Sequence, residues 1–191
     1  MKFSLSREAL LKPLQLVVGV VERRQTLPIL SNVLLSLDQS RLSMTGTDLE
    51  VEIVGVTDIG SGGEDGDVTV SARKLVDICR SLPEEAQIDF SSGDGKATLK
   101  SGRSKFTLAT LPANEFPSVD EGEKTVAFMV PGSALKALLE ATSFAMAQQD
   151  VRSYLNGMLW ELNNNQLLAV ATDGPRMAMC NGVGEVAVAE P

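Results

Sequence analysis

Two aspartates in matching local settings are the residues of this chain whose type and spacing could do chemistry. Asp48 and Asp173 each follow a threonine and stand 125 residues apart. Two carboxylates contributed by similar halves are the arrangement with which aspartic proteases share a proton. Those enzymes hold the carboxylates in Asp-Thr-Gly turns, whereas this chain has Thr-Asp-Leu and Thr-Asp-Gly. The pattern therefore favours aspartates that hydrogen-bond the backbone of their own turns; an enzyme using Asp48 and Asp173 is the alternative.

Other sites for catalysis or metal binding are weakly supported. The chain has no histidine, which is the usual general base and the commonest metal ligand. The glycine-rich residues 60–66 lack the Lys-Ser/Thr that follows a phosphate-binding loop. The acidic segment Glu64–Asp67 lacks the spacing of a calcium loop. Cys79 and Cys180 lie in apolar patterns and predict reduced core thiols. We therefore expect no enzyme, no metal and no cofactor.

Basic and acidic residues are segregated along the chain, whose net charge is −8. Acidic residues gather in predicted loops. Arg73 and Arg80 are seven residues apart and so share one face of a predicted helix, opposite its apolar face. Arg24 and Gln149 stand 125 residues apart, each in a predicted loop between a helix and a strand. Such faces suit contact with phosphates without reading of bases; ordinary solvated helix faces are the alternative.

The elements that position these residues occur twice. Residues 3–53 align with residues 128–178 without a gap, and ten of the 51 aligned pairs are identical. Self-similarity of this kind indicates two copies of one domain. The last residue, Pro191, corresponds to position 66 of the first copy. We therefore expect the chain to stop half-way through the second copy.

Hydrophobic periodicity predicts the elements of each copy. A strand at Lys2–Ser6 precedes a helix from Arg7 to Val20, in which Pro13 is expected to produce a kink. Strands at residues 27–58 follow, and then a second strand–helix–strands unit whose helix spans Arg73–Leu82. After a polar linker, Ala113–Lys124, copy two repeats the pattern with a helix at Ser133–Met146 and strands at Tyr154–Leu162, Leu167–Ala171 and Arg176–Cys180.

Several long stretches resemble one family. They are TLPILSNVLL, MTGTDLEVE, SGRSKFTLATLPANEFP, QQDVRSYLNGMLWE and VATDGPRMA. With them the chain resembles, along its whole length, the beta subunit of bacterial DNA polymerase III, the sliding clamp. The resemblance implies an α+β DNA-clamp fold of repeated strand–helix–strands units, with helices on the inner face and antiparallel sheets outside. Residues 1–122 would form a complete clamp domain one, and residues 123–191 the first half of domain two, with domain three absent.

The resemblance also implies a function. Family members form a ring of two chains around duplex DNA and act as a processivity factor that tethers the replicative polymerase. The implied partners are duplex DNA of any sequence, and the DNA polymerase III catalytic subunit and the clamp loader, which bind through short peptide motifs. The side of the ring contact that domain three supplies would be missing. A natural short paralogue that binds partners without closing a ring is the alternative.

The family's functional residues map onto positions that match its motifs. The resemblance places Arg24, Gln149 and Tyr154 at the DNA, where the helix pattern adds Arg73 and Arg80. The ring contact would use Lys74, Arg103, Lys105, Phe106 and Leu108. The peptide pocket would use Leu155, Thr172, Gly174, Pro175, Arg176 and Met177, where the family often has histidine at position 175. No apolar run reaches the length of a membrane span, and we expect a cytoplasmic bacterial protein.

Overall fold

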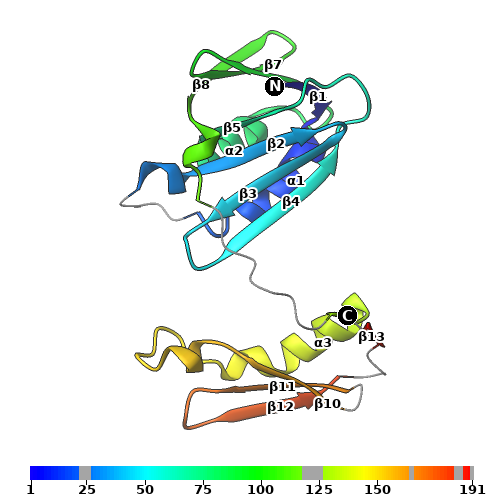
Figure 1. Ribbon diagram of the computed structural model, residues 1–191, viewed down its shortest axis with the longest axis vertical. Helices are drawn as coiled ribbons and strands as arrows, with labels where there is room; N and C mark the ends of the chain where they lie inside the picture. Colours follow the sequence, from blue (N-terminus) through cyan, green and yellow to red (C-terminus); the bar gives the residue numbers. More distant parts are fainter. Residues whose placement is uncertain (22–26, 118–126, 164–165, 183–186, 190–191) are drawn as a thin grey trace. The chain divides into compact units, whose positions relative to one another are not determined.

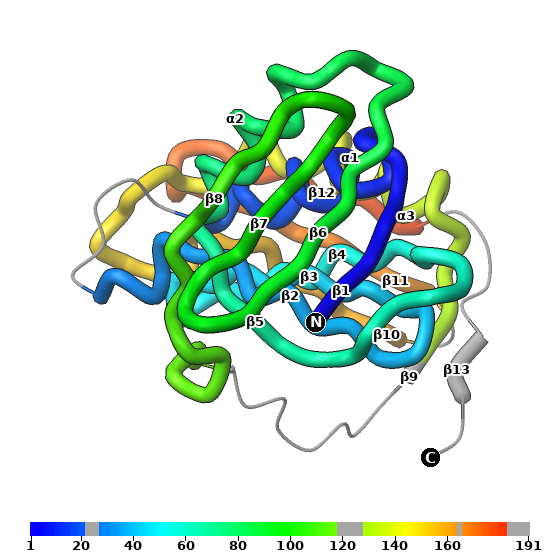
Figure 2. The backbone as a smooth tube through the Cα atoms, turned by 90° about the horizontal axis from the view of Figure 1, so that it is seen from above, coloured from blue at the N-terminus to red at the C-terminus, as the bar shows by residue number. Residues whose placement is uncertain are grey.

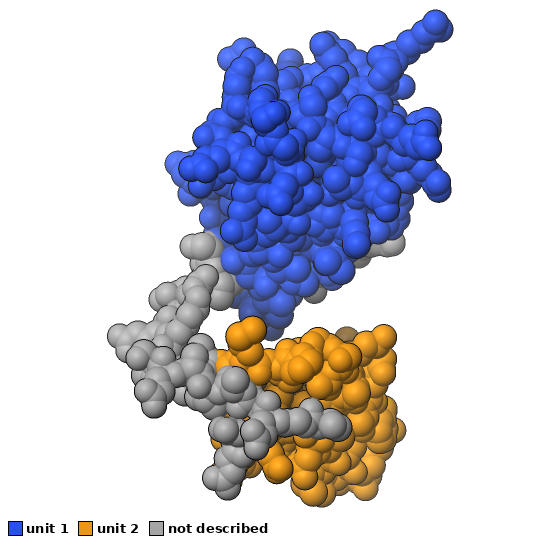
Figure 3. Space-filling view, turned by 90° about the vertical axis from the view of Figure 1, so that its right-hand side faces the viewer, with its two compact units in different colours: residues 1–120 blue, residues 121–191 orange. Residues whose placement is uncertain are grey.

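The chain folds into two compact units. The computed structural model describes residues 1–191 except 22–26, 118–126, 164–165, 183–186 and 190–191. Unit 1 spans residues 1–120 and unit 2 spans residues 121–191 (Figure 3). Within the described residues, the strand–helix–strands pattern occurs twice in unit 1 and once in unit 2.

Unit 1 begins with a half that is anchored by a capped helix. Its elements are β1 (Lys2–Ser6), α1 (Arg7–Val17), a 3-10 turn (Pro28–Ser31), β2 (Asn32–Asp38), β3 (Arg41–Thr47) and β4 (Glu52–Asp58). The Ser6 hydroxyl accepts a hydrogen bond from the Ala9 amide at 3.3 Å, which satisfies one of the free N–H groups at the start of α1. The apolar stripe of α1 is buried, so this helix covers one face of the sheet.

The second half of unit 1 repeats this order. It consists of β5 (Gly66–Ser71), α2 (Ala72–Ser81), β6 (Gln87–Gly93), β7 (Lys96–Ser101), β8 (Ser104–Leu111) and a 3-10 turn (Ala113–Glu115). In α2 the buried residues lie opposite the exposed Arg73 and Arg80, as the helix pattern predicted.

The two halves of unit 1 exchange their first strands. The antiparallel strand order is β1-β6-β7-β8-β5-β2-β3-β4. Phe3 of β1 stands opposite Phe90 of β6, and Val70 of β5 stands opposite Val33 of β2. The helices α1 and α2 lie together on one side of the strands, and β6, β7 and β8 run side by side (Figures 1 and 2). Each half therefore completes the sheet of the other.

One apolar core joins both halves. Its buried side chains come from α1, α2 and seven of the strands, and include Leu10, Leu14, Leu35, Leu42, Leu75, Ile88 and Leu99. Cys79 belongs to this core, and burial raises the pKa of its thiol to about 11. Cys180 of unit 2 is half-buried, and both cysteines are free thiols. The prediction of reduced thiols is confirmed.

Pro13 is accommodated inside α1 by a glycine on the neighbouring strand. The helix runs through Pro13 and ends at Val17, three residues earlier than predicted. A Cβ atom at Gly55 of β4 would lie 2.9 Å from both the Cβ and the carbonyl oxygen of Pro13. Real Cβ contacts are not that short, so the absence of a side chain at position 55 lets β4 approach the helix.

Unit 2 contains one strand–helix–strands set. Its elements are β9 (Ala127–Met129), α3 (Gly132–Thr142), 3-10 turns at Ser143–Ala145 and Ser153–Asn156, β10 (Leu159–Asn163), β11 (Gln166–Thr172), β12 (Met177–Asn181) and β13 (Ala187–Ala189). The sheet order is β10-β11-β12, and β13 pairs with β9. A small core of Leu138, Leu167 and Ala169 joins α3 to the sheet.

Three further predicted boundaries were wrong, and each has a local cause. Helix α3 ends at Thr142 rather than at the predicted Met146. The Thr142 hydroxyl donates back to the Leu138 carbonyl at 2.8 Å, and such bonds compete with continuation of the helix. Residues 153–156 form a 3-10 turn rather than a strand, since the Asn156 side chain and the Leu155 carbonyl bond the preceding loop. Residues 28–31 are also a 3-10 turn, which begins at a proline that lacks the N–H a ladder needs.

Candidate functional site

The two aspartates each close a turn with their own backbone. The Asp48 carboxylate accepts from the amides of Glu50 and Val51 at 3.0 and 2.7 Å. The Thr47 hydroxyl donates to the Val51 carbonyl at 2.9 Å and accepts from the Leu49 amide at 3.0 Å. Accepted hydrogen bonds favour the charged form, and they lower the pKa of Asp48 below its ordinary value. This geometry confirms the turn interpretation.

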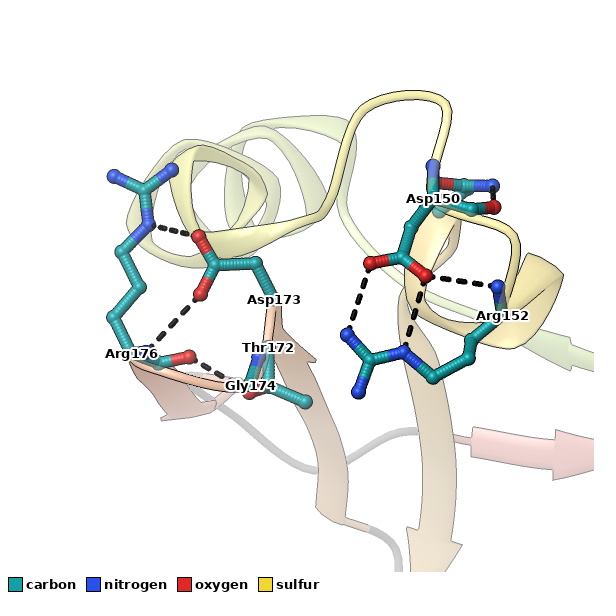
Figure 4. A network of polar contacts seen from close by, with 7 residues as sticks. Asp150, Arg152, Thr172, Asp173, Gly174 and Arg176 are labelled. Carbon is teal, nitrogen blue, oxygen red and sulfur yellow. Dashed lines mark hydrogen bonds and ion pairs between the residues drawn. The ribbon is translucent and has the colours of Figure 1, made fainter.

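The equivalent turn in unit 2 keeps three of these four bonds and adds one from an arginine side chain (Figure 4). The Thr172 hydroxyl donates to the Arg176 carbonyl at 2.7 Å and accepts from the Gly174 amide at 3.0 Å. Pro175 has no N–H to match that of Glu50. The second oxygen of Asp173 instead accepts from Nε of Arg176 at 2.8 Å. The turn therefore forms with Pro175 although that residue has no N–H to donate.

The residue after each aspartate has a left-handed backbone conformation and differs in size between the two turns. Leu49 adopts φ +82° and Gly174 adopts φ +102°, a left-handed region that suits glycine. A Cβ at Gly174 would lie 3.8 Å from Nη2 of Arg152, which is an ordinary van der Waals contact, so this turn lies beside that guanidinium. Arg152 is held by Asp150 through two charged contacts, Nε to Oδ1 at 3.0 Å and Nη2 to Oδ2 at 2.9 Å. These contacts lower the pKa of Asp150 to about 2.

Removing the Asp48 carboxylate should loosen its turn in a pH-dependent way. Asp48→Ala loses two backbone hydrogen bonds, and we expect the free energy of unfolding of unit 1 to fall by about 1 kcal/mol at pH 7 after discounting for solvent screening. The folded pKa is lowered, so this stability is present above the unfolded pKa and is lost as pH falls through the folded value. Denaturant unfolding at pH 7 and pH 3 measures the difference.

Asp48→Asn is the matched control for that change. It keeps an acceptor oxygen in the turn but cannot titrate. We expect Asp48→Asn to retain most of the free energy of unfolding at pH 7. At pH 3 the difference in this free energy between the variant and the wild type should be smaller than at pH 7. An Asp48→Ala penalty of the same size at both pH values would contradict the role of the charge.

The basic residues predicted on α2 line a groove between the two helices of unit 1. The groove has a volume of about 360 Å³ and is lined by Gln15, Val18, Arg73, Val76, Asp77 and Arg80. Nη2 of Arg73 donates to the Val21 carbonyl at 3.1 Å, which fixes the direction of its guanidinium. Gln15 and Arg80 are exposed. Two arginines, a glutamine and the Asp77 carboxylate therefore face solvent along the surface of the two helices, which carries a net positive charge there.

Of the other residues that were predicted to contact DNA, two are exposed and one lies outside the described residues. Gln149 is exposed and adopts φ +56° in the loop after α3. Tyr154 is 75% exposed in the 3-10 turn of the same connection. Arg24 lies outside the described residues. Arg152, which lies between Gln149 and Tyr154 in the chain, was not among the predicted residues, although the spacing Asp150-x-Arg152 signals a local ion pair.

The predicted contact strand β8 has a partly open edge. Residues 104–109 pair with β7, while only Thr110 and Leu111 pair with β5, so the described part of unit 1 leaves the edge of residues 104–109 unpaired on that side. A groove of about 450 Å³ beside this edge is lined by Lys74, Asp77, Ile78, Lys105, Phe106, Thr107 and Leu108. Four predicted contact residues thus come together, while Arg103 is exposed in the preceding turn.

The described parts of the chain show neither a metal site nor a membrane-spanning helix. These parts contain no cluster of three or more acidic or cysteine side chains able to hold a metal ion. Their helices are too short or too polar to cross a bilayer.

Comparison with known proteins identifies the family. The model of the DNA polymerase III beta subunit, N-terminal domain, matches residues 1–120, and the model of the central domain matches residues 129–187. The chain belongs to the DNA polymerase III beta-subunit family. The beta sliding clamp of Pseudomonas aeruginosa is 60% identical over 181 residues, which are 95% of this chain and 49% of that protein. The Escherichia coli clamp is 51% identical over 181 residues, or 95% and 50% of the two chains.

Solved structures of the family agree in fold. A sliding clamp from Pseudomonas aeruginosa superposes with a TM-score of 0.92 at 57% identity, covering 98% of this chain and 50% of that one. Caulobacter crescentus pol III beta gives 0.87 at 38% identity, covering 97% and 51%. The expected α+β clamp fold is confirmed. The chain spans about half the length of the curated relatives it matches.

Proposed function

We propose that this chain contributes the first domain and half of the second domain of a DNA sliding clamp, a processivity factor of the bacterial cytoplasm. In this proposal residues 1–122 form clamp domain one, residues 123–191 form the first half of domain two, and no residues correspond to domain three. The groove of α1 and α2, with Arg73, Arg80 and Gln15 facing solvent, is the observation that carries the proposal. Arg24, Gln149 and Tyr154 would add contacts.

The charge distribution favours backbone contact with DNA. The chain as a whole carries a net charge of −8, so attraction to phosphates has to come from a local basic face. Arginine and glutamine side chains on helices can contact phosphates, and such contacts carry no sequence information. A ring would then hold duplex DNA by enclosure, while its inner face made weak contacts with any sequence.

Replacing both helix arginines tests this proposal. We expect the wild-type chain to bind duplex DNA weakly, irrespective of sequence, and less tightly as salt is added. Arg73→Ala with Arg80→Ala should lower affinity about tenfold at low salt and reduce the slope of log K against log salt by about 1.8, because two phosphate contacts are lost. Fluorescence anisotropy over a salt series on two unrelated duplexes measures both effects.

Lys96→Ala with Lys100→Ala is the matched control. These exposed lysines alternate on β7 with the buried Ala97 and Leu99, so they point to the face of the sheet opposite the helices. The charge change is the same, but we expect little loss of affinity. Equal losses for the two double variants, or a strong preference for one duplex, would contradict a DNA-facing helix surface.

The β8 edge suits a contact between subunits of a ring. Unpaired backbone groups along residues 104–109 are a template for another strand. Lys74, Arg103 and Lys105 would attract an acidic partner edge, and Phe106 would supply apolar contact over the buried Leu108. In a homodimeric clamp that partner edge would belong to domain three of the second subunit.

The turn of unit 2 suits a short peptide from the DNA polymerase III catalytic subunit or the clamp loader. Gly174 leaves room beside the turn, Met177 is 68% exposed, and Arg176 and Arg152 provide donors at the rim. Leu155, Thr172 and Pro175 would complete the near wall. An apolar surface with a basic edge fits a peptide with an aliphatic or aromatic anchor.

The alternatives explain less. An enzyme that uses Asp48 and Asp173 would need one carboxyl poised to carry a proton, yet the pKa of each is lowered by hydrogen bonds within its own turn. A short paralogue that binds partners without closing a ring would use the same surfaces, and it would differ in assembly rather than in contacts.

A further inference from the structure

Helix α2 carries one carboxylate among three cations. The charged residues of its ten positions are Arg73, Lys74, Asp77 and Arg80. At about 100° per residue, Asp77 lies about 40° around the helix axis from Arg73 and about 60° from Lys74, with these two cations on opposite sides of it. Asp77 therefore separates the row formed by Arg73 and Arg80 from the side of α2 that holds Lys74.

The two grooves along α2 meet at this carboxylate. One groove, of about 360 Å³, lies between α1 and α2, and the other, of about 450 Å³, lies beside β8. Of the described residues that line them, Asp77 is the only one that the two grooves share and the only acidic one in either. The proposed partners of both grooves are negatively charged, with phosphates in the first and an acidic edge in the second. The charge of Asp77 therefore opposes both proposed contacts.

No contact among the described residues explains a carboxylate at this position. Asp77 is exposed, and its side chain forms no ion pair or hydrogen bond with them. Nη2 of Arg73, one turn earlier, donates instead to the Val21 carbonyl at 3.1 Å. Asp77 also lies beyond the first turn of α2, which is the part of a helix that a negative charge stabilises. The carboxylate therefore contributes little to the stability of unit 1.

We propose that Asp77 sets the strength of the contact with DNA, because its carboxylate opposes the phosphates that Arg73 and Arg80 attract and so keeps that contact weak. This role rests on the proposed function, in which a ring holds duplex DNA by enclosure. A ring of that kind needs no tight contact, and a tight contact would slow its movement along the duplex. One repulsive charge among attractive ones leaves the helix surface basic while it limits the affinity.

Coulomb's law gives the expected size of this effect. In water, two unit charges about 10 Å apart change an affinity roughly twofold. A duplex brings more than one phosphate near the groove, so we expect Asp77→Asn to raise the affinity for duplex DNA about threefold at low salt. Asp77→Lys changes the charge twice as much and should raise the affinity about tenfold. Both gains should shrink as salt is added, because exposed charges are screened beyond about 10 Å at 0.1 M salt.

Fluorescence anisotropy over a salt series on two unrelated duplexes measures these gains. Asp77→Glu is the control that keeps the charge, and it should bind like the wild type. Asp94→Asn removes a carboxylate elsewhere, since Asp94 is exposed in the turn between β6 and β7, beside a pocket to which neither helix contributes. Asparagine tolerates the φ of +52° at this position, and Asp94→Asn should leave the affinity unchanged.

The role of Asp77 is overturned if Asp77→Asn binds no tighter than the wild type, if Asp94→Asn gains as much affinity, or if the gain is the same at every salt concentration. The proposed function has a separate test in the loss of affinity on Arg73→Ala with Arg80→Ala. If that double variant loses affinity while Asp77→Asn gains none, the helix surface stands and the role of Asp77 falls. If neither variant changes the affinity, both proposals fall.

Discussion

Leu14→Ala should destabilise unit 1 by about 3 kcal/mol, while the equivalent change Leu139→Ala should cost unit 2 about 1 kcal/mol. Leu14 has 0% exposure in the joint core of both halves, so truncation leaves a cavity that close packing cannot readily fill. Leu139 is 36% exposed, and less apolar surface returns to water when it is shortened.

Amide hydrogen exchange measures the two changes separately, because peptides from β2 and β6 report on unit 1 and peptides from β10 and β11 report on unit 2. Unit 2 should also exchange faster than unit 1 in the wild type. Equal penalties for the two variants would mean that Leu139 is as well packed as Leu14, contrary to its exposure.

Gly55→Ala should destabilise unit 1 by about 1–3 kcal/mol, a typical cost of overpacking. The new methyl group would lie 2.9 Å from the carbonyl oxygen and the Cβ of Pro13, and the proline ring and helix backbone cannot rotate away. Either β4 or α1 must shift, and both contribute to the core. Thermal unfolding should show a lower midpoint, with exchange rising first in β4.

Gly93→Ala is the control for this substitution. Gly93 ends β6, and a Cβ there would meet no atom within 4 Å. The replacement should be neutral or slightly stabilising, because alanine restricts the unfolded chain. A neutral Gly55→Ala would show that the contact between β4 and Pro13 is not needed for α1 to run through its proline.

Much of the fold is encoded locally and was predictable. The repeat predicted equivalent turns at Asp48 and Asp173. Both turns share the bonds of their threonine hydroxyl and the amide bond from the third residue after the aspartate, because these donors and acceptors lie within four residues of each other. Helical spacing likewise placed Arg73 and Arg80 on one exposed face of α2. Boundaries near Thr142 and Pro28 were less predictable, since single side chains there compete with the regular backbone pattern.

The sequence by itself determined the kinds of elements, their repetition and the family, because periodicity and turn chemistry depend on neighbouring residues. Only the tertiary structure decided which strands exchange between the halves, why Pro13 is tolerated opposite Gly55, and that Arg152 approaches Gly174. It also decided that Leu14 is buried while Leu139 is exposed. Periodicity shows that a side chain faces a core, but the partner that covers it comes from distant residues, and a local pattern does not specify that partner.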